Sequence, residues 1–459
     1  MARQTSKILF FLLTISVSVS LFILSREHLP QIISWKAVSK NLRSREKGSL
    51  FDNYAVLQQE KGNWTPPSVV FTTSHKAKFA DTTQRSSETK LKNDLITTSP
   101  QTETPIPIVF HKSFNKLPQW DFEDVYNEDA PPRLTNCAPS LRNLKDEAFQ
   151  KDFLPNIRLF LYKDNIDMRE WNRLSHFNSP FGFMELKYDD VMASVKLIPK
   201  PKEPLLLPKP TGNGCVHCAV VGTAGILNGS KLGAEIDAHD YVFRMNGAII
   251  EGFEEDIGNR TSVYVHTAHS ITASPFFFQK YGYTSVPHDE GIKYVLIPEG
   301  MSDFQWLEGL LKGERISAGK YANKEPRTYY SGQYNESRFY VLHQDFLRYV
   351  RNRFLRSSNL NTTYWPIVRP TNGAFTLFLA LHTCDIVSAY GFITEDYNKY
   401  SNYYFQKRIK SDLIFYINHD YNLEKDLWKS LHDRKIINLY QRTGPQEETE
   451  KLKESWYST

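Results

Sequence analysis

The chain has 459 residues, of which 41% are hydrophobic and 23% are charged. This composition provides enough apolar material for a sizeable core, and it excludes a wholly disordered protein. The 56 lysines and arginines exceed the 51 aspartates and glutamates by only five charges, an excess too small and diffuse for a nucleic-acid-binding protein. We therefore expect no nucleic-acid partner, whereas a small anionic substrate is compatible with this charge.

The N-terminal region contains an uncharged apolar run at residues 8–24. A helix of this length spans about 25 Å, which suits a thin membrane. We predict a signal-anchor at 8–24 that follows a cytoplasmic tail at 1–7. The alternative is a cleaved signal peptide, because Ser18-Val19-Ser20 is a small-x-small cleavage pattern. The anchor is favoured because the apolar run continues past that site.

Two features bear on the orientation of the anchor. The lysines and arginines at 36–47 outnumber those that precede the run, and by the positive-inside rule this opposes a lumenal body. Five N-glycosylation sequons favour a lumenal body, because such sites are modified only in the secretory lumen. The candidate asparagines are Asn63, Asn228, Asn259, Asn335 and Asn361. We expect a single-pass type II protein.

The four cysteines are Cys137, Cys215, Cys218 and Cys384. They allow two disulfides in three possible pairings, and two disulfides suit an oxidising lumen. Cys215-Val-His-Cys218 alternatively fits a redox dithiol or half of a zinc site, but the chain has no second Cys-x-x-Cys. We predict structural disulfides, and the cysteines alone leave their pairing open.

Composition divides the remainder of the chain. Residues 25–130 lack sustained periodicity and are rich in serine, threonine, lysine, glutamine and proline. Such a segment cannot bury enough apolar surface to offset chain entropy, so we predict a largely disordered stem. A folded domain is predicted at 131–445, and a polar tail at 446–459.

The folded domain alternates predicted strands with predicted helices. Strands are expected at 218–222, 240–246, 386–391 and 413–417, and helices at 230–239, 372–383 and 421–433. This alternation indicates an α/β fold with a mostly parallel central sheet. Ligands of such folds bind beyond the carboxyl ends of the strands.

Several residues occupy that expected edge. Gly222 and Thr223 follow the first strand, where a backbone can approach a phosphate, although their spacing matches no nucleotide-binding fingerprint and fits a packed turn equally well. Asn246 ends the second strand, as a ligand-binding amide or as a turn residue. His419 follows the segment 413–417 and suits proton transfer at neutral pH, although a lone histidine is more often structural.

Three motifs are absent from the sequence. There is no Asp-x-Asp, the pattern with which nucleotide-sugar enzymes commonly hold a divalent metal, so a transferase here is expected to work without metal. There is no Gly-x-Ser-x-Gly and no His-Glu-x-x-His, so serine hydrolases and zinc peptidases lose their usual support.

Taken together, these segments resemble the animal sialyltransferases, glycosyltransferase family 29. Residues 218–264 resemble the large sialylmotif of the family, and residues 369–392 resemble the small sialylmotif. Tyr403-Tyr-Phe-Gln406 lies where the short third motif is expected. His419 and Glu424 match the very small motif, a histidine followed by a glutamate after four intervening residues. The four motifs occur in the order of the family.

The resemblance implies a variant GT-A fold, which is Rossmann-like, and a catalytic domain that lies in the Golgi lumen. It implies transfer of sialic acid from CMP-sialic acid to a terminal sugar, without metal or another cofactor. His419 would be the general base that takes the proton from the acceptor hydroxyl, with inversion at the anomeric carbon. Anchor, stem and sequons agree with an enzyme of the Golgi membrane.

The resemblance also assigns roles to other residues. The donor nucleotide would contact Gly222, Thr223, Asn246, Thr371, Asn372 and Gly373. Tyr403, Tyr404 and Glu424 would support the site. The implied disulfides are Cys218–Cys384, joining the large and small motifs, and Cys137–Cys215.

Within the family, the pattern is nearest to the α-2,6 branch that acts on N-acetylgalactosamine (GalNAc) of mucin-type O-glycans. Acceptors would be glycoproteins with serine- or threonine-linked GalNAc, bare or carrying galactose, and residues 267–366 would govern acceptor choice. Thr223 stands where asparagine is usual, Tyr403 and Gln406 where histidine and an acid are usual, and Asn372 where threonine or serine is usual. The alternatives are a sialyltransferase of another linkage and a catalytically weakened Golgi glycan-binding protein.

Overall fold

The computed structural model describes residues 103–202, 204–207, 214–406 and 415–442. Apart from Tyr416–Asn418, these residues belong to one compact unit. The predicted cytoplasmic tail, anchor and polar tail, most of the predicted stem and the sequon at Asn63 lie outside the described residues. Within the described ranges, no helix is both long and apolar enough to cross a membrane.

The fold is built on a parallel sheet. In the part of the chain that the structure describes, this sheet has seven strands in the order β5-β4-β3-β2-β1-β6-β7. They are β1 (His217–Val221), β2 (Tyr241–Met245), β3 (Val263–His266), β4 (Lys293–Leu296), β5 (Phe339–Val341), β6 (Ile386–Tyr390) and β7 (Asn438–Leu439). The chain runs outward from β1 to β5 and then returns to add β6 and β7 on the other side of β1. The topological switch point therefore lies between β1 and β6, where folds of this kind bind ligands.

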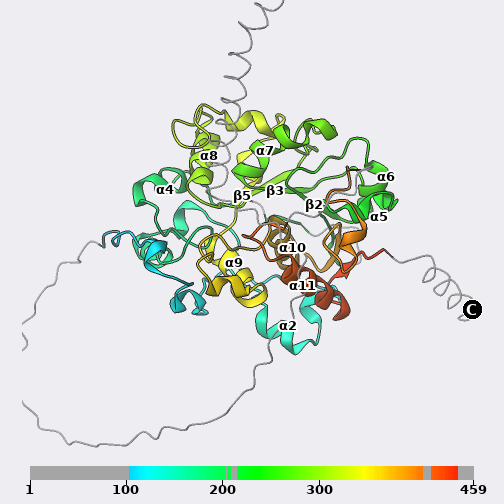
Figure 1. Cartoon of the computed structure of the whole chain (residues 1–459), viewed down its shortest axis with the longest axis horizontal. Helices are drawn as coiled ribbons and strands as arrows, with labels where there is room; N and C mark the ends of the chain where they lie inside the picture. The colour runs from blue at the N-terminus through cyan, green and yellow to red at the C-terminus, as the bar shows by residue number, and fades with distance from the viewer. Residues whose placement is uncertain (1–102, 203, 208–213, 407–414, 443–459) are drawn as a thin grey trace, which may run out of the picture. The chain divides into compact units, whose positions relative to one another are not determined.

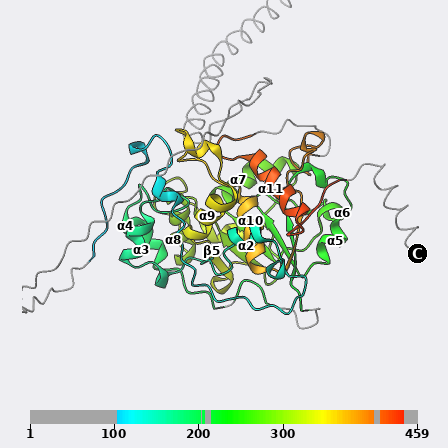
Figure 2. The same ribbon diagram turned by 90° about the horizontal axis from the view of Figure 1, so that it is seen from below.

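Helices cover the sheet on both sides. They are α2 (Glu147–Asp152), α3 (Met168–Leu174), α4 (Tyr188–Val195), α5 (Gly233–Asp237), α6 (Glu254–Ile257), α7 (Ala268–Phe278), α8 (Met301–Lys312), α9 (Gln344–Tyr349), α10 (Asn372–Thr383) and α11 (Tyr421–Asp433), with a π-helix (Val350–Phe354) that continues α9. In Figure 1, α7 and α8 lie above the labelled strands, and α10 and α11 lie below them. Helix α10 packs across β3, β2, β1 and β6, and Figure 2 shows this side of the domain.

The side chains of β1 alternate between two hydrophobic cores. Cys218 and Val220 belong to the larger core, whereas Ala219 and Val221 belong to a second core with residues of α5. All four are buried, which is the pattern of a strand that is covered on both faces. The continuous apolar sequence of β1 is therefore explained by its central position in the sheet.

Most of the predicted elements are confirmed, since β1, β2, β6, α10 and α11 lie where strands and helices were expected. The predicted helix 230–239 is shorter, because Lys231 has a positive φ of 58° and α5 begins only at Gly233. The predicted strand 413–417 is wrong where it is described, since residues 415–417 form no extended strand. The strand that pairs with the outer side of β6 is β7.

Two long stretches without motifs contribute more structure than the sequence suggested. Residues 267–366 hold β4, β5 and three α-helices. Residues 103–130, which we name the N-terminal strap, belong to the predicted stem but pack on the domain. Leu117 is 3% exposed and lies in a hydrophobic cluster with Leu360 and Trp365. The folded part therefore begins before the predicted boundary at residue 131.

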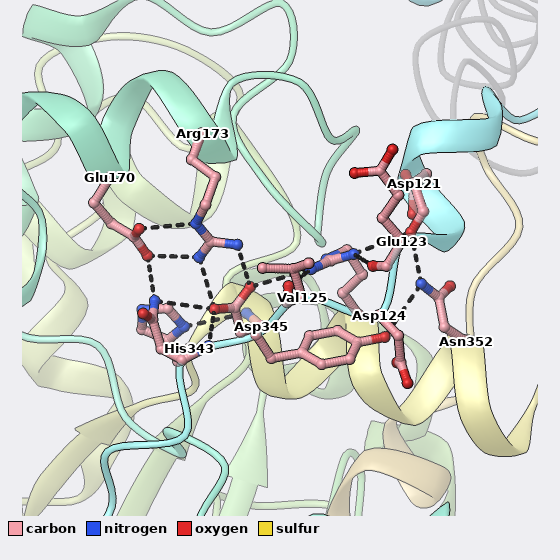
Figure 3. Close-up of polar contacts among 12 residues, drawn as sticks. Asp121, Glu123, Asp124, Val125, Glu170, Arg173, His343, Asp345 and Asn352 are labelled. Atoms are coloured by element: carbon pink, nitrogen blue, oxygen red, sulfur yellow. Dashed lines mark hydrogen bonds and ion pairs between the residues drawn. The ribbon is translucent and has the colours of Figure 1, made fainter. Parts of the chain in front are cut away.

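A network of ion pairs and hydrogen bonds also holds the strap, and Figure 3 shows it. Asp121 of the strap is buried and pairs with the equally buried guanidinium of Arg351 in the π-helix. Arg348 donates to the carbonyl oxygens of Asp121 and Glu123, each at 3.0 Å. Two buried arginines are thus neutralised or hydrogen-bonded by a segment that lies more than 220 positions earlier in the chain.

The structure contains the disulfides Cys137–Cys215 and Cys218–Cys384, the pairs that the resemblance implies. None of the cysteines is left unpaired. Cys384 directly follows the last residue of α10, and Cys218 is the second residue of β1. The second disulfide therefore fixes α10 to the sheet at the end of the helix that is remote from Thr371.

Candidate active site

The carboxyl ends of β1 and β6 approach each other backbone to backbone. The Gly222 N–H donates to the Tyr390 carbonyl at 2.8 Å, and the Ala224 N–H donates to the Gly391 carbonyl at 3.1 Å. A Cβ atom on Gly222 would lie 2.5 Å from the Gly391 oxygen, closer than any real side chain comes to a carbonyl. Glycine at position 222 is therefore required by the closure of the switch point.

Two amides join the end of β2 to the start of α10. Asn246 follows β2 with a φ of 54°, a left-handed conformation that asparagine tolerates better than most residues. The Asn372 amide, on the first residue of α10, donates from Nδ2 to the Asn246 Oδ1 at 2.8 Å. Gly373 follows in the first turn of α10. The sequence-predicted residues Asn246, Asn372 and Gly373 thus lie together beside the switch point.

The N-terminus of α10 is held by a glutamate of α11. Thr371 is the N-cap of α10, and its Oγ1 accepts the Ala374 N–H at 3.1 Å. The Thr371 N–H and hydroxyl donate to Oε1 and Oε2 of Glu424, each at 2.7 Å. Glu424 is 5% exposed, and its burial raises the pKa of the carboxyl to about 7. Glu424 therefore contacts Thr371 directly, as a structural support of the helix start.

His419 lies in the loop directly before α11. Its Nδ1 is 2.9 Å from the carbonyl oxygen of Arg369. A carbonyl can only accept, so Nδ1 carries the proton in the neutral ring, and Nε2 is the basic nitrogen. Burial and the Arg369 guanidinium lower the pKa of the ring to about 4. The imidazole is therefore neutral at neutral pH, with a defined tautomer.

The segment 403–406 packs against the end of β1. The Tyr404 N–H donates to the Thr223 carbonyl at 3.1 Å, and the buried Tyr404 hydroxyl bonds to both the N–H and the carbonyl of Ile249. Tyr403 stacks on Phe405 with ring centroids 5.0 Å apart. Gln406 donates to the Tyr281 hydroxyl at 3.2 Å. Tyr404 thus supports the loop that carries Thr223.

Four predicted sequons lie in the described residues. Asn259, Asn335 and Asn361 are exposed, and Asn228 is half-buried. The described ranges contain no group of three or more histidine, cysteine, aspartate or glutamate side chains that could hold a metal ion.

One polar pair at this edge was missed by the sequence analysis. Glu299 follows β4, and its Oε1 accepts from Nε of Arg369 at 3.0 Å. Arg369 opened the segment that resembles the small motif, but nothing in the sequence pointed to its partner 70 positions away.

Residues 160–436 match the model of glycosyltransferase family 29 (sialyltransferase). The chain is 45% identical over 339 residues to alpha-N-acetylgalactosaminide alpha-2,6-sialyltransferase 1 of Gallus gallus, covering 72% of this chain and 59% of that protein. It is 42% identical over 412 residues to the Homo sapiens protein of the same name, covering 88% of this chain and 64% of that protein.

A further relative is matched over most of its length. Alpha-N-acetylgalactosaminide alpha-2,6-sialyltransferase 2 of Mus musculus is 39% identical over 347 residues, which cover 75% of this chain and 91% of that protein. The alignments with the first two relatives span only 59% and 64% of their lengths. The family model covers more than half of this chain, from Phe160 to Ile436. The chain belongs to glycosyltransferase family 29, the sialyltransferases.

Proposed function

We propose that this protein transfers sialic acid from CMP-sialic acid to the 6-hydroxyl of GalNAc that is O-linked to serine or threonine, bare or carrying galactose. The relatives at 39–45% identity bear the name of this activity. The observation that carries the proposal is the neutral His419, whose Nδ1 bonds to the carbonyl of Arg369 in the segment that leads to Asn372, the partner of Asn246.

His419 acts as the general base in this proposal. The acceptor O6–H gives its proton to Nε2 while O6 attacks the anomeric carbon of the donor. The bond from that carbon to the CMP phosphate oxygen breaks, and CMP leaves as an anion with inversion of configuration. The donor carboxylate and phosphate are negative, so their binding raises the pKa of a nearby imidazole and strengthens the base.

The donor side of the site consists of backbone and amides. Gly222 and Thr223 offer a close backbone approach, and the first turn of α10 at Asn372 and Gly373 presents the positive end of a helix dipole. Such groups stabilise the negative charge that develops on a departing phosphate. The residues at this edge supply the base and the anion-stabilising groups themselves, so the proposed reaction needs no metal and no other cofactor.

The proposed activity also implies a cellular location and a class of acceptors. We place it in the Golgi membrane as a single-pass type II protein with a variant GT-A catalytic domain in the lumen and mucin-type O-glycoproteins as acceptors. A second candidate function is a weakened glycan-binding protein, favoured by Thr223, Tyr403 and Gln406. In the structure Gln406 bonds to Tyr281, and an acid at this position would make a different contact.

The test uses the chain from residue 103 onward, secreted, because the strap is part of the fold. The protein is incubated with CMP-sialic acid and desialylated mucin in the presence of a chelator, and the product linkage is read by mass spectrometry. We expect α-2,6-linked sialic acid on GalNAc. Absence of product from folded protein would favour the weakened binder, and another linkage would favour the other alternative.

The role of the base is tested by His419→Ala, which should abolish transfer while secretion persists. The matched control is His239→Ala, since His239 lies before β2 at the opposite edge of the sheet. Undiminished turnover by His419→Ala would contradict the assignment of the base.

A further inference from the structure

A carboxylate from a stretch without motifs lies beside the loop that holds His419. Glu299 comes shortly after β4, at the same carboxyl edge of the sheet as Asn246. Its Oε1 accepts from Nε of Arg369 at 3.0 Å, and the two side chains are only 14% and 11% exposed. An ion pair that is so little exposed is weakly screened by solvent and salt.

Arg369 connects this ion pair to the imidazole. Its side chain binds Glu299, and its carbonyl oxygen accepts from His419 Nδ1 at 2.9 Å. Pro370 restricts the backbone of Arg369 to an extended conformation, and Thr371 is in turn fixed by Glu424. The Arg369 carbonyl, which orients the His419 ring, therefore belongs to a residue that is fixed by Glu299 at its side chain and by the Thr371–Glu424 contact further along the backbone.

We propose that Glu299 is a positioning residue for His419, acting through its ion pair with Arg369. The inference rests on the proposed function of His419 as the base. Glu299 would hold the guanidinium so that the carbonyl keeps its direction, and its negative charge would offset the positive charge of Arg369 at the ring.

The charges around the ring support this role. Arg369 lowers the pKa of His419 and Glu299 raises it. On the side of the ring formed by α11, Asp420 caps the helix and accepts the Ser357 hydroxyl at 2.7 Å, Glu424 bonds to Thr371, and the Tyr421 ring contacts the imidazole.

The Glu299–Arg369 pair has three further titratable neighbours, His269 of α7, Asp303 of α8 and Lys320. Asp303 is buried and accepts the Ala268 N–H at 2.8 Å. Burial and the adjacent Glu299 raise the pKa of its carboxyl well above its usual range, and among the described residues Asp303 makes no ion pair with Arg369 that would replace the Glu299 contact. Glu299 is thus the carboxylate that balances Arg369 among these groups.

The experiment measures the pH dependence of kcat/KM with the full-length chain in detergent micelles. In Glu299→Gln the amide oxygen can still accept from Arg369, but the negative charge is lost. A neighbouring unit charge at a partly buried site shifts a pKa by about one unit, so the acidic limb should move down by about one pH unit. The plateau should fall about threefold because the base is weaker, with an unchanged KM for CMP-sialic acid.

Arg369→Gln should move the acidic limb in the opposite direction, and the double variant should lie near the wild type. The matched control is Glu308→Gln, which removes a half-buried carboxylate of α8 that pairs with Lys312 and should leave the profile unchanged. A loss of activity in Glu299→Gln with no movement of the limb would overturn the proposal, because a merely structural role predicts that result.

A second readout does not require turnover. The His419 ring is titrated by NMR in the histidine-labelled full-length chain, and its signal is identified by its absence in His419→Asn. We expect the same downward shift in Glu299→Gln and upward shift in Arg369→Gln. Identical ring titrations in wild type and both variants would overturn the proposal. Opposite ring shifts in a chain without transferase activity would uphold the ion-pair role and reject the proposed function instead.

Discussion

Substitution of Glu424 tests how the buried carboxylate couples the fold to pH. The pKa of this carboxyl rises from 4.5 to about 7 on folding, mainly through burial. The folded state therefore binds more protons than the unfolded state between pH 4.5 and 7. Stability falls as the pH rises through this window, and above pH 7 the full cost of ionising the buried group is present.

The magnitude follows from the size of this shift. A shift of about 2.5 units, at 1.36 kcal/mol per unit, corresponds to about 3 kcal/mol of unfolding free energy. Glu424→Gln is uncharged at every pH. Its Oε1 can accept from the Thr371 N–H, and its Nε2 can donate to Thr371 Oγ1, so both contacts have a neutral replacement. We expect the pH-dependent loss of about 3 kcal/mol between pH 4.5 and 7 to be absent from this variant.

The assay is urea unfolding of the secreted chain from residue 103, with disulfides intact, at half-unit steps from pH 4.5 to 8. The difference in unfolding free energy between variant and wild type should change by about 3 kcal/mol across this range, in favour of the variant at high pH. The curve of Glu308→Gln, which removes a half-buried carboxylate paired with Lys312, should run parallel to that of the wild type. Parallel curves for Glu424→Gln would refute the reasoning, because they would mean that Glu424 does not titrate in this window.

Three further substitutions test separate parts of the structure. Gly222→Ala places a Cβ atom 2.5 Å from the Gly391 carbonyl oxygen, so transfer should fall at least about tenfold, and an unchanged rate would contradict the close approach. Asp121→Asn leaves the buried Arg351 without its counter-charge and should cost about 3–5 kcal/mol, which thermal unfolding would report as a drop of several degrees. Thr223→Asn offers a longer side chain to the donor and should lower the KM for CMP-sialic acid; an equal or higher KM would argue against a donor contact at this position.

The elements that the sequence predicted well are those with local patterns. Strand β1 is a short apolar run before a glycine, and α10 has apolar spacing along its whole length after a threonine N-cap. Strand β7 has only two residues, too few for any periodic signal. The segment 413–417 has the composition of a strand, but its described residues 415–417 form no extended strand. Whether an apolar run joins a sheet depends on neighbours that are distant in sequence, and these leave no trace in a local pattern.

The N-terminal strap was missed for a related reason. Its composition is that of a stem, and its stability comes from partners that are distant in sequence, such as Arg348 and Arg351. The same holds for Glu299, which has no periodic or motif context and whose significance appears only when Arg369 lies beside it. Asn246 could be singled out because it directly follows a strand, whereas His419 and Asn372 were marked by the family motifs.

The segment from Arg369 to Thr371, whose carbonyl orients the His419 ring, is bound by two glutamates that are distant in sequence. Glu299 forms an ion pair with the Arg369 side chain, and Glu424 accepts from the Thr371 N–H. Just before this segment, Val368 packs in the hydrophobic cluster that includes Leu117 of the strap.

The strap reaches the same region through its backbone. The Leu117 N–H donates to the Leu360 carbonyl at 3.0 Å, and the Trp365 indole donates to the Phe114 carbonyl at 3.1 Å. The strap precedes residue 160, where the match to the family model begins. A chain that starts at residue 131 therefore keeps every sialylmotif residue, but it loses the packing that holds the segment leading to Arg369. Because the direction of the Arg369 carbonyl sets the orientation of the His419 ring, the geometry of the proposed base depends on residues outside all four motifs.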